Sequence, residues 1–194
     1  MLVAGFGVPT SSMLPLARGL RAAGHRPRIA RTGLNVDCGE RTVSRLLDSL
    51  DGPVALVGHS RGGQLARVAA VRRPDLVTRL VTVGTPWSIG PPDRPGVARV
   101  TRAVRAARRH GLPLLASIEC ADGPCCEAYR ADLRRRPDAP WVALWSSADR
   151  VAGDDARPPI EATSSRDVGG SHLGLVLSHR GRRAIAEALM APMS

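Results

Sequence analysis

Short apolar runs alternate along this chain with longer stretches in which apolar and polar residues recur at helical spacing. Short apolar runs bounded by turn residues are typical of buried strands in a parallel sheet, and the amphipathic stretches are typical of the helices that cover it. The pattern therefore predicts an α/β fold, with a mostly parallel sheet of about six strands flanked by helices. The predicted strands are Leu2–Ala4, Arg28–Arg31, Val54–Gly58, Leu80–Val83, Val142–Trp145 and Arg166–Val168.

A single domain, residues 1–194, is predicted because a chain of 194 residues can enclose one sizeable core. No internal repeat or low-complexity tract interrupts the pattern. No apolar run approaches the roughly 20 residues that a membrane-spanning helix needs, and the opening residues do not resemble a signal peptide. We therefore expect a cytoplasmic location.

The most informative motif is GHSRGG at residues 58–63, which lies between a predicted strand and the helical stretch Gln64–Ala70. A serine at a sharp strand-to-helix turn has a strained backbone, and the chain closes around it only if the residues two before and two after are very small. Gly58 and Gly62 occupy those positions. The motif predicts a nucleophile elbow that exposes the Ser60 hydroxyl at the carboxyl edge of the sheet.

A nucleophilic serine needs a histidine to accept its proton, and the histidine needs a carboxylate to orient it. Asp149 follows the predicted strand Val142–Trp145, and His172 follows the last predicted strand in a glycine-rich turn. They are the leading candidates for acid and base. Asp154 and Asp155 are alternative acids in the same loop, whereas Asp167 precedes the histidine too closely to orient it well.

An oxyanion hole needs two backbone N–H donors, one from the residue after the nucleophile and one from the loop after an earlier strand. Arg61 follows the serine and supplies the first candidate amide. Phe6, in the glycine-rich turn after the first predicted strand, supplies the second, and Gly7 is the neighbouring alternative. A helical stretch from Met13 to Ala23 is predicted to follow this turn.

The GFG turn at residues 5–7, the GHSRGG motif and the VGTP sequence at residues 83–86 resemble the lipase and esterase families of the α/β-hydrolase superfamily. The chain order Ser60, Asp149, His172 is also that superfamily's order. The resemblance extends over most of the chain and is weakest at about residues 91–138, where such families place a lid. It implies a minimal α/β-hydrolase fold that lacks the first two strands of the family sheet.

By this resemblance we expect a serine hydrolase that cleaves carboxylic esters through an acyl-enzyme, with a small-molecule or lipid ester as substrate and with no metal or organic cofactor. Two other functions stay open. The same residues could serve an acyltransferase or a thioesterase acting on a carrier-bound acyl chain. The fold could also serve a non-catalytic binding protein.

The net charge of +11 comes from arginine alone, since the sequence contains no lysine. This usage most simply indicates a GC-rich bacterial genome. Residues 97–110 nevertheless predict a basic amphipathic helix, which would either cover the pocket or contact an anionic membrane surface or an acidic acyl carrier. Nucleic-acid binding is not expected, because aromatic residues make up 3% of the chain and no reader motif is present.

Four cysteines are present, at positions 38, 120, 125 and 126. Their spacing does not indicate a zinc site. Cys120 could pair with Cys125 or Cys126, and Cys38 could pair with a member of this cluster. Disulfides persist chiefly in oxidising compartments, so free thiols and a disulfide both stay open.

Overall fold

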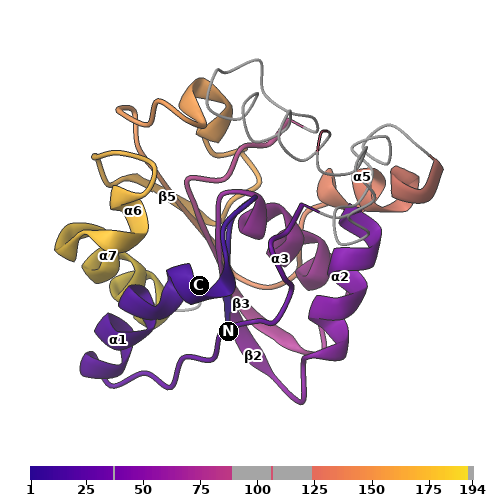
Figure 1. Cartoon of the computed structure of the whole chain (residues 1–194), viewed down its shortest axis with the longest axis horizontal. Coiled ribbons are helices and arrows are strands. Elements are labelled where there is room, and N and C mark those ends of the chain that lie inside the picture. Colours follow the sequence, from indigo (N-terminus) through magenta and orange to yellow (C-terminus); the bar gives the residue numbers. More distant parts are fainter. Residues whose placement is uncertain (37, 89–105, 107–123, 192–194) are drawn as a thin grey trace.

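In the computed structural model, which describes residues 1–36, 38–88, 106 and 124–191, a parallel sheet is covered by helices on both faces (Figure 1). The sheet has five strands in the spatial order β1-β2-β3-β4-β5. Every neighbouring pair is parallel, which confirms the predicted fold class. The strands are β1 Leu2–Val3, β2 Val54–His59, β3 Val77–Val83, β4 Trp141–Trp145 and β5 Ser164–Asp167.

The strand predicted at Arg28–Arg31 is reduced to one isolated bridge, in which Ile29 pairs in parallel with Leu2. Leu2 donates its N–H to the Arg28 carbonyl at 2.7 Å, and the Ala30 N–H donates to the Leu2 carbonyl at 2.9 Å. The pairing stays short because β1 itself spans only two residues. The segment still extends the sheet past β1.

The order of segments across the sheet creates a reversal between β1 and β2. The chain passes from β1 to the bridge at Ile29 on one side and then crosses to β2 on the other side of β1. In open parallel sheets, ligands commonly bind outside the carboxyl ends of the strands at such a switch point. The turn that contains Phe6 follows β1 here, and Ser60 follows β2.

Strand residues alternate between two cores, one on each face of the sheet. Leu2, Val57 and Val81 contribute to the core under the C-terminal helices. Their neighbours Val3 and Leu56 contribute to the opposite core. This alternation follows from the two-residue period of a strand, and burial on both faces explains why the sequence shows continuous apolar runs.

Helices cover these cores in two groups (Figure 1). One face carries η1 Thr10–Met13, α1 Leu14–Ala22, α6 Gly174–Leu177 and α7 His179–Met190. The other carries α2 Gly39–Asp48, α3 Arg61–Arg72 and α5 Glu127–Leu133. Two further 3₁₀ turns are η3 Pro124–Cys126 and η4 Gly153–Ala156. The helix predicted at Met13–Ala23 corresponds to α1.

The predicted lid at residues 91–138 falls mostly outside the described residues, as does the basic helix predicted at 97–110. The described end of the lid segment forms η3 and α5. Arg72 on α3 binds Asp132 on α5 at 2.7 Å, so this part packs against the body of the fold. Among the described residues no helix combines the length and apolar character needed to cross a bilayer.

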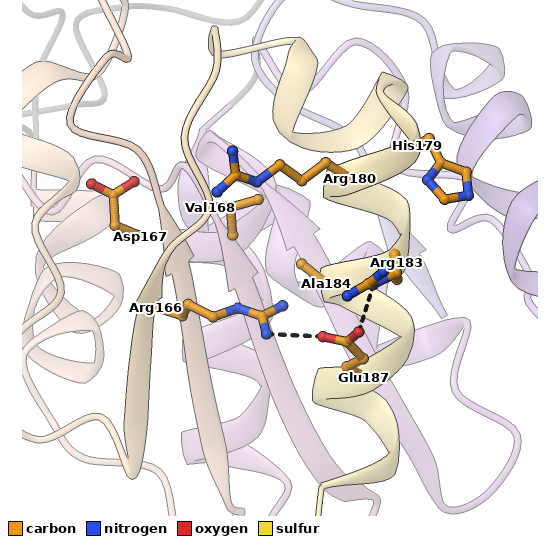
Figure 2. Close-up of a pocket in the computed structure, with 8 residues that line it drawn as sticks. All are labelled: Arg166, Asp167, Val168, His179, Arg180, Arg183, Ala184 and Glu187. Atoms are coloured by element: carbon orange, nitrogen blue, oxygen red, sulfur yellow. Dashed lines mark hydrogen bonds and ion pairs between the residues drawn. The ribbon is translucent and has the colours of Figure 1, made fainter.

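Edge strand β5 and helix α7 border a groove of about 400 Å³, whose lining residues are shown in Figure 2. Glu187 on α7 accepts from Arg166 on β5 and from Arg183 on α7, each at 2.9 Å. The pair with Arg166 connects the last helix to the edge of the sheet, and the pair with Arg183 lies within α7. The groove is not lined by Ser60, Asp149 or His172.

Candidate active site

Ser60 lies between the last residue of β2 and the first residue of α3 with φ 55° and ψ −130°. A positive φ is uncommon for a residue with a side chain and costs of order 1–3 kcal/mol. The Ser60 N–H donates to the Val83 carbonyl at 2.9 Å, and its own carbonyl accepts from the Gly63 N–H at 2.9 Å. These bonds hold the half-buried serine in the strained turn that the motif predicts.

Glycines at two motif positions make this turn possible. A Cβ at Gly58 would overlap the backbone of Gly62 and Gly63. A Cβ at Gly62 would overlap the carbonyl groups of Val3 and Ala4 at the end of β1. The elbow therefore closes against both its own helix and the neighbouring strand, and no residue with a side chain fits at either glycine.

Asp149 and His172 meet although 23 residues separate them, with Nδ1 of the imidazole 2.7 Å from Oδ2 of the carboxylate. Asp149 lies in the loop after β4, and His172 lies in the loop between β5 and α6. Both are buried, with 2% and 8% of their surfaces exposed. The structure thus brings the predicted acid and base together at the carboxyl edge of the sheet.

The Asp149 carboxylate accepts further hydrogen bonds from the backbone. Its Oδ1 accepts from the N–H groups of Val151 at 2.8 Å and Ala152 at 2.9 Å. Burial alone would raise the pKa of this carboxyl, but the bonds from His172 and the two amides outweigh it and hold the pKa below its usual value. Asp149 is therefore an ionised, fixed acceptor.

This acceptor sets the tautomer of His172. A carboxylate can only accept, so Nδ1 carries the proton and donates it to Asp149. Nε2 of the neutral ring is then an acceptor. An imidazole in this state can take a proton from a hydroxyl through Nε2, which is the role of a general base.

The two loops that carry this pair are joined by Ser146, a residue that the sequence analysis did not single out. Its hydroxyl donates to the Gly170 carbonyl at 2.7 Å and accepts from the Ala148 N–H at 3.1 Å. Ser146 is fully buried. Its position directly after a buried strand and three residues before Asp149 was the only available signal for this role.

His59, the residue before the serine, also contacts His172. Its Nε2 donates to the His172 carbonyl at 3.0 Å, and the two ring centroids lie 4.6 Å apart. Burial, followed by the proximity of His172, lowers the pKa of His59 to about 3. His59 is therefore neutral and joins the elbow to the histidine loop, as an element that shapes the site.

Gly84, directly after β3, packs against the Asp149–His172 pair. It has φ +53°, and a Cβ there would lie 3.3 Å from Asp149 Oδ2 and 3.4 Å from His172 Nδ1. The same Cβ would lie 2.8 Å from Leu175 Cδ1. The glycine of the VGTP sequence therefore allows the backbone to approach the pair closely.

The turn after β1 is fixed by two hydrogen bonds. The Gly7 N–H donates to the Leu34 carbonyl at 2.8 Å, and Asn35 Nδ2 donates to the Ala4 carbonyl at 2.6 Å. Since the Gly7 amide already has an acceptor, it is a poorer oxyanion donor than the amide of Phe6. Both residues are half-buried.

This turn lies against the elbow. A Cβ at Gly5 would be 3.1 Å from the Cβ of Ser60, and the Arg61 guanidinium lies 5.8 Å from the centroid of the Phe6 ring. The turn that carries Phe6 therefore lies next to Ser60, and Arg61 follows the serine directly. Arg61 is the first residue of α3, where backbone N–H groups and the helix dipole favour negative charge.

The alternative acids have other partners. Asp155 accepts from the Ser88 N–H at 2.9 Å and from its hydroxyl, and Asp167 accepts from the Gly169 N–H at 2.8 Å. Asp154 pairs with Arg157 at 3.4 Å on the surface. In the described part of the chain, no group of three or more His, Cys, Asp or Glu residues is arranged to hold a metal ion.

Comparison with known proteins relates this chain to a known fold. The model of a family described as "alpha/beta hydrolase fold" matches residues 42–114, a range that includes the elbow. An extracellular α/β-hydrolase from a Paenibacillus species has a similar structure, with a TM-score of 0.64, 16% identity, and coverage of 97% of this chain and 96% of that one.

Two further solved structures resemble this one. A monoacylglycerol lipase from Paleococcus ferrophilus has a TM-score of 0.64 and 18% identity, over 97% of this chain and 92% of that one. Polyneuridine aldehyde esterase has a TM-score of 0.57 and 13% identity, over 97% and 96%. The predicted resemblance to the α/β-hydrolase superfamily is thus confirmed, and this chain has the α/β-hydrolase fold.

Proposed function

We propose that this protein is a serine hydrolase that cleaves carboxylic esters, with Ser60 as nucleophile, His172 as general base and Asp149 as the residue that orients the base. The observation that carries the proposal is the buried Asp149–His172 hydrogen bond of 2.7 Å. His59, the neighbour of the strained serine, is bonded to the same histidine. Together these contacts support a nucleophile, base and acid at one edge of the sheet.

In this mechanism the Ser60 hydroxyl attacks the carbonyl carbon of the ester while His172 Nε2 accepts its proton. The backbone amides of Phe6 and Arg61 donate to the oxyanion of the tetrahedral intermediate. His172 then protonates the departing alcohol, which leaves an acyl group on Ser60. Water, activated by the same imidazole, hydrolyses the acyl-enzyme and releases the acid.

The ionised carboxylate of Asp149 supports both halves of this cycle. It holds the Nδ1–H tautomer before the attack and stabilises the imidazolium after each proton transfer. The three hydrogen bonds that it accepts favour its charged form, so it stays an acceptor throughout. The steps need no metal and no organic cofactor.

A small-molecule or lipid ester is the substrate class that we propose. The names of two structural neighbours, a monoacylglycerol lipase and polyneuridine aldehyde esterase, describe enzymes that act on esters. At 18% and 13% identity these neighbours show the fold alone, so the substrate has to be determined on this protein.

The test is hydrolysis of p-nitrophenyl esters of increasing acyl length, from acetate to palmitate, by the wild type and Ser60→Ala at matched concentration. Loss of the nucleophile should lower kcat by at least about 10³-fold, because binding and oxyanion stabilisation alone leave little catalysis. Ser165→Ala, on the exposed strand β5, is the matched control and should retain wild-type turnover.

The acyl length with the highest kcat/KM will distinguish an esterase from a lipase. Undiminished turnover by folded Ser60→Ala would contradict the proposal. A folded wild type that hydrolyses no ester in the series would instead favour a carrier-bound thioester or a binding role. Product analysis in the presence of an alcohol acceptor would reveal an acyltransferase.

A further inference from the structure

Cys38 and Cys126 bring two thiols into contact across 88 residues of sequence, with their Sγ atoms 3.2 Å apart. Cys38 is the N-cap residue of α2, and Cys126 is the N-cap residue of α5. Both are buried, with 6% and 3% of their surfaces exposed. We propose that these two cysteines are a disulfide-forming pair that cross-links α2 to α5.

The scaffold around the pair holds the two helices in place independently of the sulfur atoms. Arg72 on α3 binds both carboxylate oxygens of Glu40 on α2, at 2.6 and 2.8 Å. The same guanidinium binds Asp132 on α5 at 2.7 Å. Because one arginine connects both helices, the separation of the two cysteines is set by the fold.

Close packing next to the thiols also supports the pairing. The ring of Tyr129 on α5 lies so near Gly39 that a Cβ at this glycine would be 2.9 Å from two ring carbons. Gly39 adjoins Cys38, and its lack of a side chain lets the start of α2 pack directly against the Tyr129 ring of α5. The Tyr129 hydroxyl lies 3.5 Å from Gln64 Oε1 on α3, in the same core.

Only a small movement separates the contact from a covalent bond. A disulfide bond is about 2.05 Å long, so the two sulfur atoms must approach each other by roughly 1 Å to form it. At 3.2 Å the sulfur atoms of Cys38 and Cys126 are therefore already close neighbours in the folded protein.

Bond formation removes two electrons and needs an oxidant, for which we name a peroxide. One thiol is oxidised by hydrogen peroxide to a sulfenic acid, and one water leaves. The second thiol then attacks the sulfenic sulfur, the S–S bond forms, and a second water carries away the remaining proton and oxygen. Two thiols and one peroxide thus give one disulfide and two waters.

The cross-link would close a covalent loop that contains β2, α3 and β3. A loop of this length restricts the unfolded chain strongly, so the oxidised protein should have a higher Tm than the reduced protein. We expect an increase of about 5–15 °C for a chain of this size. The inference does not depend on the proposed ester hydrolysis.

The experiment compares the full-length protein after reduction with dithiothreitol and after treatment with hydrogen peroxide. Thiols are alkylated in denaturant, the protein is digested without reduction, and mass spectrometry identifies the linked peptides. Cys126→Ser should lose the link to Cys38 and the increase in Tm. Cys125→Ser and Cys120→Ser are matched controls and should keep both.

The expected result is a peptide that contains Cys38 linked to Cys126 in the wild type and in both controls. Recovery of Cys38 as an alkylated thiol after oxidation would overturn the proposal. So would a link from Cys38 that persists in Cys126→Ser, or a link between two protein molecules. Fragment ions from cleavage between Cys125 and Cys126 in the wild-type peptide show which of these adjacent residues is linked to Cys38. A variant that fails to fold therefore does not decide the outcome.

Discussion

The Nε2–H of His59 donates to the carbonyl oxygen of His172 at 3.0 Å, and the two imidazole rings lie 4.6 Å apart. His59 ends β2 and directly precedes Ser60, whereas His172 lies in the loop before α6. The residue before the proposed nucleophile therefore fixes the backbone of the proposed base. We therefore expect His59 to be a positioning residue, which acts through the loop that carries His172.

Replacing His59 with alanine should lower kcat for ester hydrolysis by about 10- to 100-fold, because the His172 carbonyl loses its donor and a cavity opens beside the ring. KM should change little, since His59 is buried and only 4% of its surface is exposed. His59→Gln supplies an N–H at a similar distance and should restore most of the lost kcat. Equal defects in the alanine and glutamine variants would argue against the hydrogen bond as the cause.

The acid stability of the protein should depend on His59. Its pKa in the folded protein is lowered from 6.5 to about 3 by burial and by His172. Between these two pH values the unfolded chain binds a proton at this residue and the folded chain does not. The free energy of unfolding therefore falls as pH decreases through this window, and rises with pH within it.

Near pH 4 the loss due to His59 should amount to about 3 kcal/mol. Urea unfolding at pH 7 and pH 4 measures it as the difference between the wild type and His59→Gln, which carries no titrating ring. His179→Gln, at an exposed position on α7, is the control and should keep the wild-type pH dependence. An unchanged pH dependence in His59→Gln would show that His59 is not the group responsible.

The central strands could be predicted from the sequence because buried parallel strands are local and continuous apolar runs, whereas the edge strand β5 is polar and exposed. A local pattern was not sufficient at Arg28–Arg31, where a strand was predicted but only Ile29 forms a bridge to the sheet. A strand's length depends on its partner, and β1 offers two residues for pairing. The register of that pair is a property of the tertiary structure, so no local pattern contains it.

The elbow could also be predicted because its signal is local. The need for small residues at Gly58 and Gly62 arises within a few residues of Ser60. The supporting contacts are long-range and left no such pattern. Ser146 reaches Gly170 across 24 residues, and Cys38 reaches Cys126 across 88. Side chains that meet only after folding have no fixed spacing, which explains why these roles were missed or left open.

Asp149→Asn should lower kcat by about 10³- to 10⁴-fold with little loss of binding. Asparagine has nearly the same shape, but its amide cannot stabilise an imidazolium and no longer selects the Nδ1–H tautomer of His172. Steady-state kinetics on the best p-nitrophenyl ester measure the effect. Circular dichroism should confirm that the variant is folded.

The alternative acids provide matched controls for this substitution. Asp154 is exposed and Asp155 binds Ser88, so Asp154→Asn and Asp155→Asn should each retain turnover within about 5-fold of the wild type. A large loss of kcat in Asp155→Asn, with Asp149→Asn close to the wild type, would reassign the acid.

Gly84→Ala tests whether the close approach of the backbone at the end of β3 keeps the proposed catalytic pair, Asp149 and His172, in position. The new methyl group would lie 3.3 Å from Asp149 Oδ2, 3.4 Å from His172 Nδ1 and 2.8 Å from Leu175 Cδ1. To relieve these contacts, Leu175 or the Asp149–His172 pair must shift by a few tenths of an ångström. We expect kcat to fall by about 10- to 100-fold, because misplacement of a catalytic group is costly.

Gly24→Ala is the control that separates the steric contact with Asp149 and His172 from the effect of backbone strain alone. Gly24 also has a positive φ, +84°, but a Cβ there meets nothing within 4 Å. Both variants should lose about 1–2 kcal/mol of unfolding free energy from the strained alanine, and only Gly84→Ala should lose activity. If Gly24→Ala lowered kcat as much as Gly84→Ala, global destabilisation rather than contact with Asp149 and His172 would explain the loss.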